Sequence, residues 1–224
     1  MKNEKLKAIV LRRTNYQEAD RILDLVTPLG KRSVIARGVR KEKSRLAGSV
    51  ELLCESEIVL TKSNKSSLAI LTSARLIRFY GNILKSYNRM TFAYDTLKNI
   101  GKAVNQIEEP EWYDLLSQVL SGLDDLKIDL RLIRVWFLLQ YQKLLGNELN
   151  MLYDVDGKKL EKNKKYTYDY LERGLREDIG GKINGDVIKF LRVVNNNSLD
   201  LVTKIGGIDS VLGDALTLAE NHFN

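Results

Sequence analysis

The spacing of apolar residues changes near residue 80, and this change limits the folds open to the chain. Within residues 6–77, short apolar runs of strand length are separated by turn signals such as Pro28-Leu29-Gly30. Beyond residue 80, apolar residues recur at steps of three and four, which is the period of an amphipathic helix. We therefore expect strands first and helices afterwards, with a boundary near residues 78–82.

The predicted strands are 6–11, 22–27, 31–36, 50–61 and 67–76, and the predicted helices are 83–104, one beginning at Glu111, 128–145, 185–195 and 208–222. Five short strands in roughly 75 residues suit a small closed barrel or a sandwich. We predict an α+β fold, with a five-stranded OB-type β-barrel over residues 1–80. An all-helical C-terminal domain is predicted over residues 81–224, with an irregular insertion near 151–182.

Charge is distributed unevenly along the chain. The net charge is +7, from 36 Lys and Arg against 29 Asp and Glu. Residues 1–80 hold 17 basic and 8 acidic residues, whereas residues 81–224 hold 19 basic and 21 acidic residues. All of the excess positive charge therefore belongs to the predicted barrel, which favours a polyanionic partner for that module.

One stretch dominates this positive charge. Residues 31–45 contain a single acid, Glu42, and seven cations: Lys31, Arg32, Arg37, Arg40, Lys41, Lys43 and Arg45. Clustered cations release counterions from a phosphate backbone, and this release favours binding to nucleic acid. The alternative interpretation is a solvated loop that keeps the protein soluble. We take the seven cations as candidate DNA-binding residues, with Arg37, Arg40, Lys41 and Arg45 ranked first because arginine can grip a phosphate with two parallel hydrogen bonds.

The predicted barrel is poor in aromatic residues, since Tyr16 is the only one before Phe79. A typical single-strand binder stacks successive bases on several aromatic rings, and this module cannot. We therefore expect contact through phosphates, with little dependence on base sequence. Bases left unstacked stay free to pair with a second strand, as annealing requires. Tyr16 itself is either a loop anchor or a lone stacking ring, and we favour the anchor.

Catalytic and metal motifs are missing from the sequence. The chain has one histidine, His222, which we expect to be a surface or capping residue, and one cysteine, Cys54, which we expect in the core. No four-ligand zinc site of the usual kind can be assembled from them. The segment Asp154-Val155-Asp156-Gly157 lacks the spacing of a calcium loop and is interpreted as a turn. We predict no enzymatic activity, no cofactor and no metal.

No apolar run is long enough to cross a bilayer, and the first residues do not have the pattern of a signal peptide. We therefore expect no membrane partner and a cytoplasmic location.

Several sequence blocks resemble one bacterial family. They are Arg12-Arg13-Thr14-Asn15-Tyr16-Gln17-Glu18-Ala19-Asp20-Arg21-Ile22-Leu23, Thr27-Pro28-Leu29-Gly30-Lys31, Ile35-Ala36-Arg37-Gly38-Val39-Arg40-Lys41 and Ser44-Arg45-Leu46-Ala47-Gly48. In this order and spacing they resemble RecO, the recombination mediator family of DNA repair. The remainder of the chain is similar to the family mainly in architecture.

The resemblance implies an N-terminal OB barrel and a C-terminal helical domain. It also implies that the protein is not an enzyme in the usual sense. It implies binding to single- and double-stranded DNA and annealing of complementary strands. It also implies work with RecR, with or without RecF, to help RecA displace single-strand-binding protein, and association with the nucleoid when bound to DNA. The basic residues between Gly30 and Gly48 are then the DNA contacts.

Many members of the family hold zinc with two Cys-x-x-Cys pairs in the helical domain, and this chain has no cysteine there. We therefore predict that residues 151–182 are held by packing alone and are among the more mobile segments.

Asp20 and Arg21 are expected to form a structural ion pair, and Trp112 and Trp136 to lie in the core.

Two other functions stay open. An RNA-binding OB module would also account for the positive charge, and it would prefer structured RNA to single-stranded DNA. A scaffold whose basic face binds an acidic protein tail would bind peptide tightly and DNA weakly.

Overall fold

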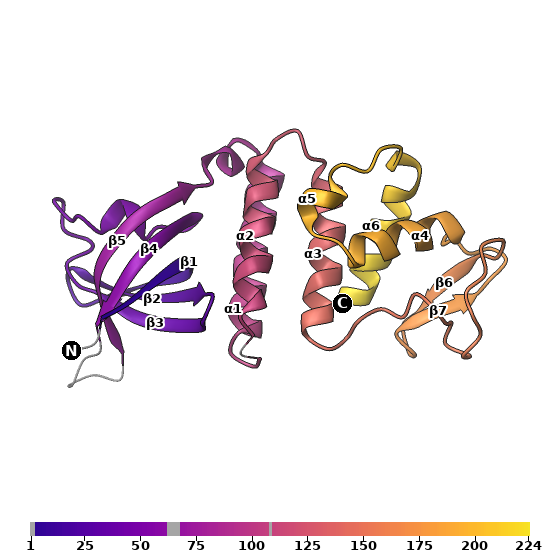
Figure 1. Ribbon diagram of the computed structural model, residues 1–224, viewed down its shortest axis with the longest axis horizontal. Helices are drawn as coiled ribbons and strands as arrows, with labels where there is room; N and C mark the ends of the chain where they lie inside the picture. The colour runs from indigo at the N-terminus through magenta and orange to yellow at the C-terminus, as the bar shows by residue number, and fades with distance from the viewer. Residues whose placement is uncertain (1–2, 62–67, 108) are drawn as a thin grey trace. The chain divides into compact units, whose positions relative to one another are not determined.

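A computed structural model describes residues 3–61, 68–107 and 109–224 (Figure 1). It divides into two compact units, an N-terminal unit of Met1–Asp124 and a C-terminal unit of Asp125–Asn224. The N-terminal unit begins with five strands: β1 (Asn3–Tyr16), β2 (Asp20–Thr27), β3 (Gly30–Ala36), β4 (Cys54–Thr61) and β5 (Ala69–Phe79). They form a closed barrel in the order β1-β2-β3-β5-β4. The predicted five-stranded barrel followed by helices is therefore confirmed.

The long first strand makes closure possible. The N-terminal half of β1 pairs with β4, and its C-terminal half pairs with β2 across an irregularity between Val10 and Arg12. The barrel is completed by a short parallel contact in which Val34 and Ile35 of β3 pair with β5. Alternate side chains point inward and form a buried core that includes Val10, Leu23, Leu25, Val34, Ile58, Leu60 and Leu71.

The helices that follow the barrel belong to the same compact unit. A short 3-10 helix, η2 (Gly81–Lys85), leads to α1 (Tyr87–Ala103) and α2 (Glu111–Asp124). The barrel strands end at Phe79, close to the boundary predicted from the sequence, but the compact unit extends to Asp124. Trp112 of α2 is fully buried, and its indole donates to the carbonyl of Ile107. The prediction that Trp112 lies in the core is confirmed.

A buried polar cluster ties this helical pair to the barrel. Glu55 of β4 is 8% exposed and accepts hydrogen bonds from the hydroxyls of Tyr80, at 2.8 Å, and Tyr113 of α2, at 2.7 Å. Cys54, beside it, is buried as predicted, and burial raises the pKa of its thiol.

The C-terminal unit contains α3 (Leu130–Leu144), β6 (Tyr166–Asp169), β7 (Gly174–Glu177), α4 (Gly185–Asn195), α5 (Leu199–Val202) and α6 (Asp209–Phe223). The side chain of Asp129 caps α3, and that of Asn184 caps α4, by accepting from backbone N–H groups of the first turn. Trp136 of α3 is buried, as predicted. The short helix α5 was not predicted.

The segment 151–182 is more regular than the sequence suggested. It contains the antiparallel pair β6–β7, preceded by a turn in which Asp154 accepts from the N–H groups of Asp156 and Lys158. The prediction that packing alone holds this segment is wrong, because Arg176 pairs with Asp169 at 2.7 Å and Asp156 at 3.2 Å. Its mobility stays a prediction.

The prediction of a surface or capping role for His222 is also wrong. The residue is 3% exposed, and its Nε2 lies 2.6 Å from the carbonyl oxygen of Asn147. The Tyr168 hydroxyl lies 3.1 Å from its Nδ1. Because a carbonyl can only accept, Nε2 carries the proton, and Nδ1 accepts from the tyrosine.

Candidate nucleic-acid interface

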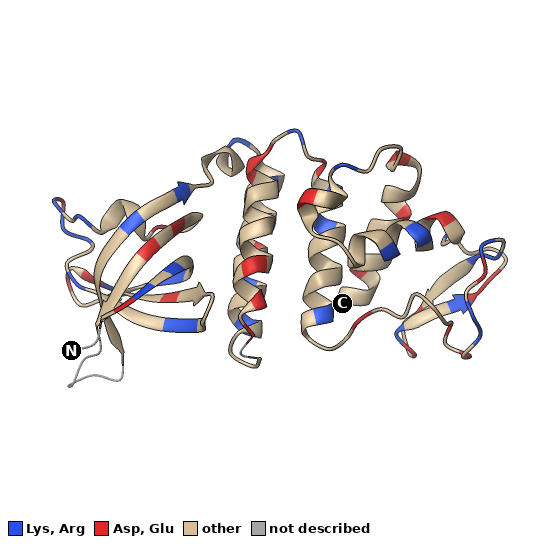
Figure 2. Ribbon diagram, viewed as in Figure 1, with Lys and Arg blue, Asp and Glu red and all other residues tan. Residues whose placement is uncertain are grey.

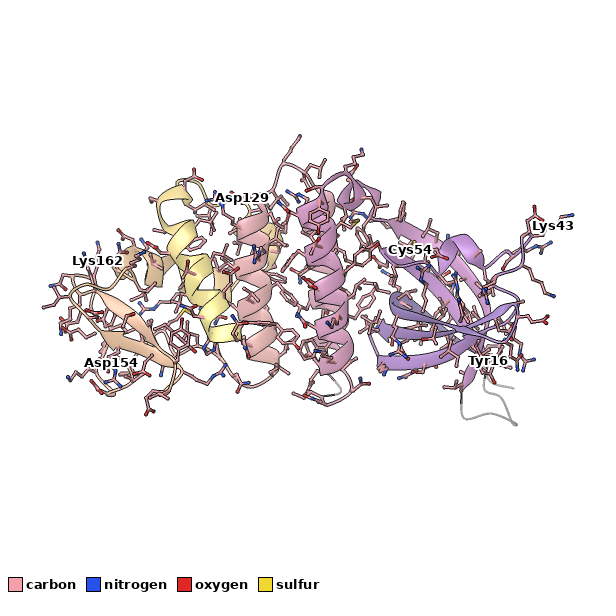
Figure 3. All side chains as sticks on the ribbon, turned by 180° about the vertical axis from the view of Figure 1, so that it is seen from behind. Tyr16, Lys43, Cys54, Asp129, Asp154 and Lys162 are labelled. Atoms are coloured by element: carbon pink, nitrogen blue, oxygen red, sulfur yellow. The ribbon has the colours of Figure 1, made fainter. Side chains whose placement is uncertain are left out.

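Five of the seven candidate cations lie together on the loop between β3 and β4. Arg37, Arg40, Lys41, Lys43 and Arg45 are all exposed. None of the five has a salt-bridge partner among the described residues. Figure 2 shows this loop as a blue segment that extends beyond the strands, and Figure 3 shows Lys43 near its tip. We call these five residues the basic loop.

The backbone of the basic loop is fastened to the β1–β2 turn. The N–H of Gly38 donates to the Asp20 carboxylate at 2.7 Å, and the N–H of Arg40 donates to the carbonyl of Ala19 at 2.9 Å. Gly38 has φ +64°, a left-handed conformation that a residue with a side chain rarely adopts. These contacts turn the chain sharply after β3 and hold the backbone while the cationic side chains face solvent.

The sequence reasoning missed two arginines near the base of the loop. Arg13 of β1 and Arg21 of β2 both pair with Glu51, with Arg21 Nη1 at 2.8 Å from the carboxylate. Burial, and then the positive charges of Arg13 and Arg40, lower the pKa of Arg21. The Glu51 carboxylate therefore pairs with both Arg13 and Arg21, and Arg40 adds a third positive charge nearby. The positive region thus extends from the basic loop onto the barrel.

The expected ion pair between Asp20 and Arg21 does not form. Asp20 accepts from the backbone of Gly38, and Arg21 donates to Glu51 and to Asn15. Adjacent residues on a strand point to opposite faces, so this pairing was geometrically unfavourable from the start. The alternation of side chains along the predicted strand 22–27, continued back to residue 20, already indicated that Asp20 and Arg21 face opposite ways.

Lys31 and Arg32 are separated from the basic loop. Both lie at the start of β3, about 13–17 Å along the strand from its end at Ala36. Arg32 donates to the carbonyls of Leu29 and Lys31, and Lys31 donates to the side chain of Asn105, just beyond the end of α1. The structure thus brings five candidates together and places two elsewhere.

Tyr16 is 41% exposed at the end of β1, where it pairs with Asp20 across the strands. Its hydroxyl has no hydrogen bond to another described residue, so no contact supports the role of a loop anchor. The ring is accessible at the same end of the barrel as the basic loop.

Within residues 3–61, 68–107 and 109–224, no group of three or more His, Cys, Asp or Glu side chains could hold a metal ion. No helix of the described chain is long and apolar enough to cross a membrane.

Comparison with known families decides between the possible barrel proteins. The family model described as Recombination protein O N terminal matches residues 1–80, and the one described as Recombination protein O C terminal matches residues 105–221. The chain belongs to the RecO family. The resemblance seen in the sequence is thereby confirmed, and the first match ends where the strands of the barrel end.

Curated relatives in several bacteria carry the name DNA repair protein RecO. The chain is 36% identical over 123 residues to the protein of Dehalococcoides mccartyi strain CBDB1, covering 54% of this chain and 48% of that one. It is 32% identical over 119 residues to that of Roseiflexus sp. strain RS-1, covering 53% and 41%. Listeria monocytogenes EGD-e has a RecO that is 31% identical over 124 residues, covering 54% and 48%. The chain spans about half the length of the curated RecO proteins it matches.

Proposed function

We propose that this RecO-family chain is a DNA-binding recombination mediator in DNA repair, and that the basic loop supplies its main phosphate contacts. The observation that carries the proposal is the basic loop itself: five exposed cations on a backbone fastened to the barrel, which no carboxylate of the described residues neutralises in an ion pair. Such a group attracts a phosphate backbone and releases its counterions. The names of the relatives support a role in DNA repair.

Contact through phosphates suits an annealing factor. The described barrel strands carry few aromatic rings, so single-stranded DNA bound there keeps most of its bases free to pair. We propose that the chain accelerates pairing by lowering the repulsion between two phosphate backbones, without a chemical step. Family membership supports RecR, single-strand-binding protein, RecF and RecA as partners, and a cytoplasmic location near the nucleoid.

The binding test uses a labelled single-stranded oligonucleotide and a variant with Arg37, Arg40, Lys41 and Arg45 changed to Ala. A matched control removes four exposed lysines of the C-terminal unit: Lys158, Lys159, Lys165 and Lys182. Fluorescence anisotropy across a salt series should give a log–log slope of about −3.5 for wild type, from about five phosphate contacts.

The loop variant should lose about four contacts, and its slope should fall towards −1, while the control keeps the wild-type slope. Equal slopes for the loop variant and wild type would show that the basic loop is only solvated surface. Tighter binding to a structured RNA, or to an acidic peptide, than to the oligonucleotide would favour the RNA-binding or the scaffold function instead.

A further inference from the structure

A cleft lies between the barrel and α1, within the N-terminal unit. It has a volume of about 420 Å³, which lies in the usual range for small-ligand sites. Its apolar lining comes from Leu11 and Leu52 of the barrel side and from Leu97 of α1. Its charged lining is four cations, Arg12, Lys31, Lys98 and Lys102, against one carboxylate, Asp24.

The single carboxylate is already occupied. Asp24 accepts from the hydroxyl of Ser33 at 2.6 Å and lies 3.7 Å from Arg12. Lys98 and Lys102 stand one turn apart on the same face of α1, so their charges repel. Neither has an ion pair with any described residue. The cleft therefore has an unbalanced positive charge, which an anion would neutralise.

Helix α1 has no side chain at one of the positions that line the cleft, Gly101. Gly101 lies in the last turn of α1, and a Cβ built there would meet no atom within 4 Å. Glycine weakens a helix, and no close packing within the described chain requires it at this position. The space that a side chain would fill is thus left open beside Lys98 and Lys102, where a ligand could approach the helix.

The position of the cleft favours a nucleic-acid strand as its occupant. Strand β3 passes the cleft at Lys31 and ends, about 17 Å further on, at Ala36, which is followed by Arg37 of the basic loop. The ring of Tyr94 lines the cleft as well and is 39% exposed, which gives a base a surface for stacking. An acidic peptide would use the cations but would have no need of the ring or of continuity with the loop.

We propose that this cleft is a second contact site for single-stranded nucleic acid, holding a phosphodiester group beside Lys31, Lys98 and Lys102 with a base against Tyr94. This inference rests on the proposed function. A strand bound to the basic loop continues along β3 and enters the cleft, so α1 takes part in binding together with the barrel.

The test fills the cleft without removing charge. Gly101→Leu should fold, because the site is open and helical, and should melt at or above the wild-type temperature. Gly213→Leu is the matched control, since Gly213 lies in helix α6 and a Cβ built there would also have open space around it. With a labelled oligo-dT of about 15 nucleotides, Gly101→Leu should weaken binding about five- to tenfold, as expected for the loss of a stacked base and a phosphate contact.

A second pair of variants tests the charges. Lys98→Gln with Lys102→Gln should reduce the magnitude of the salt slope by about 0.7, as expected for the loss of one phosphate contact, while Lys158→Gln with Lys159→Gln should leave it unchanged. If both cleft variants bind as wild type while the basic-loop variant loses binding, the cleft proposal is wrong and the proposed function stands. If the wild type does not bind the oligonucleotide, both fail. If a glutamate-rich peptide binds instead and Gly101→Leu abolishes its binding, the occupant is an acidic peptide and the nucleic-acid proposal is overturned.

Discussion

At the scale of single residues, the N-terminal unit depends on one buried carboxyl group. Glu55 accepts from two tyrosine hydroxyls, one next to the barrel strands and one on α2. Burial, and then the neighbouring Glu55, raise the pKa of Tyr80 to about 12 and raise that of Tyr113 further above its ordinary value. These bonds fix how α2 sits on the barrel.

Removing this carboxyl group should destabilise the unit strongly. Glu55→Leu removes the acceptor that two buried tyrosine hydroxyls share, and we expect a loss of about 2–4 kcal/mol in the free energy of unfolding. Glu55→Gln keeps one acceptor oxygen and should cost less. Urea denaturation of the two variants checks the order, and equal losses would contradict the role assigned to the hydrogen bonds.

The raised tyrosine pKa values predict instability at high pH. In the unfolded chain these phenols lose protons near pH 10, whereas Tyr80 in the folded chain does so only near pH 12. The unfolded state therefore binds fewer protons above pH 10, and stability falls as pH rises through this window. Tyr80→Phe with Tyr113→Phe should flatten the fall in melting temperature between pH 9 and pH 11, relative to wild type. An unchanged slope would contradict the assignment.

His222 provides a separate test in the C-terminal unit. Burial, chiefly, lowers the pKa of its imidazole, and Arg173 nearby adds to this effect. The unfolded chain then takes up a proton at higher pH than the folded chain does, so this group's contribution to stability is lost as pH falls below about 6.5. Because His222 is the only histidine, NMR titration of its ring is unambiguous. A measured pKa at or above 6.5 would contradict the buried, neutral ring.

At the scale of secondary structure, the elements whose apolar residues repeat at a regular spacing could be predicted from the sequence. Features that depend on contacts between residues distant in the chain could not. The five strands and the longer helices follow from the spacing of apolar residues, and the turn at Asp156-Gly157 follows from turn chemistry. The pair β6–β7 was missed because its strands are four residues long and lie in a polar, lysine-rich stretch. The burial of His222 was missed because Asn147 and Tyr168 are far from it in sequence.

The same limit applied to the candidate site. The cations of the basic loop were candidates because they lie within nine residues of the chain, 37–45. Glu51, which pairs with both Arg13 and Arg21, is distant from them in sequence, and the cleft exists only because α1 packs beside the barrel. No pattern within a short stretch of sequence indicates the pairing of Glu51 with the two arginines or the presence of the cleft.

The segment 151–182 gives a prediction at this scale. Lys164 pairs with Glu161 at 2.8 Å and with Glu177 at 3.0 Å, and Arg176 pairs with Asp169 and Asp156. These contacts cross-link the segment through its side chains. Arg176→Met should make the amides of β6 and β7 exchange hydrogen faster, while those of α3 stay unchanged. Equal exchange in variant and wild type would show that these ion pairs add little.

At the scale of the whole molecule, the two compact units differ in charge. Residues 1–124 hold 21 basic and 14 acidic residues, and residues 125–224 hold 15 of each. The whole net charge of +7 thus belongs to the unit that carries the barrel, the basic loop and the cleft. Electrostatic attraction to DNA should therefore come from the N-terminal unit, because the C-terminal unit has no net charge with which to attract a polyanion.

The central claim is that the chain binds DNA through phosphates and leaves the bases free to pair. The most direct test measures the annealing rate of two complementary labelled oligonucleotides across a salt series, for wild type, the basic-loop variant and the four-lysine control. We expect acceleration by wild type and control that weakens as salt rises, and its collapse in the basic-loop variant. No acceleration by wild type, or equal acceleration by the basic-loop variant, would contradict the account.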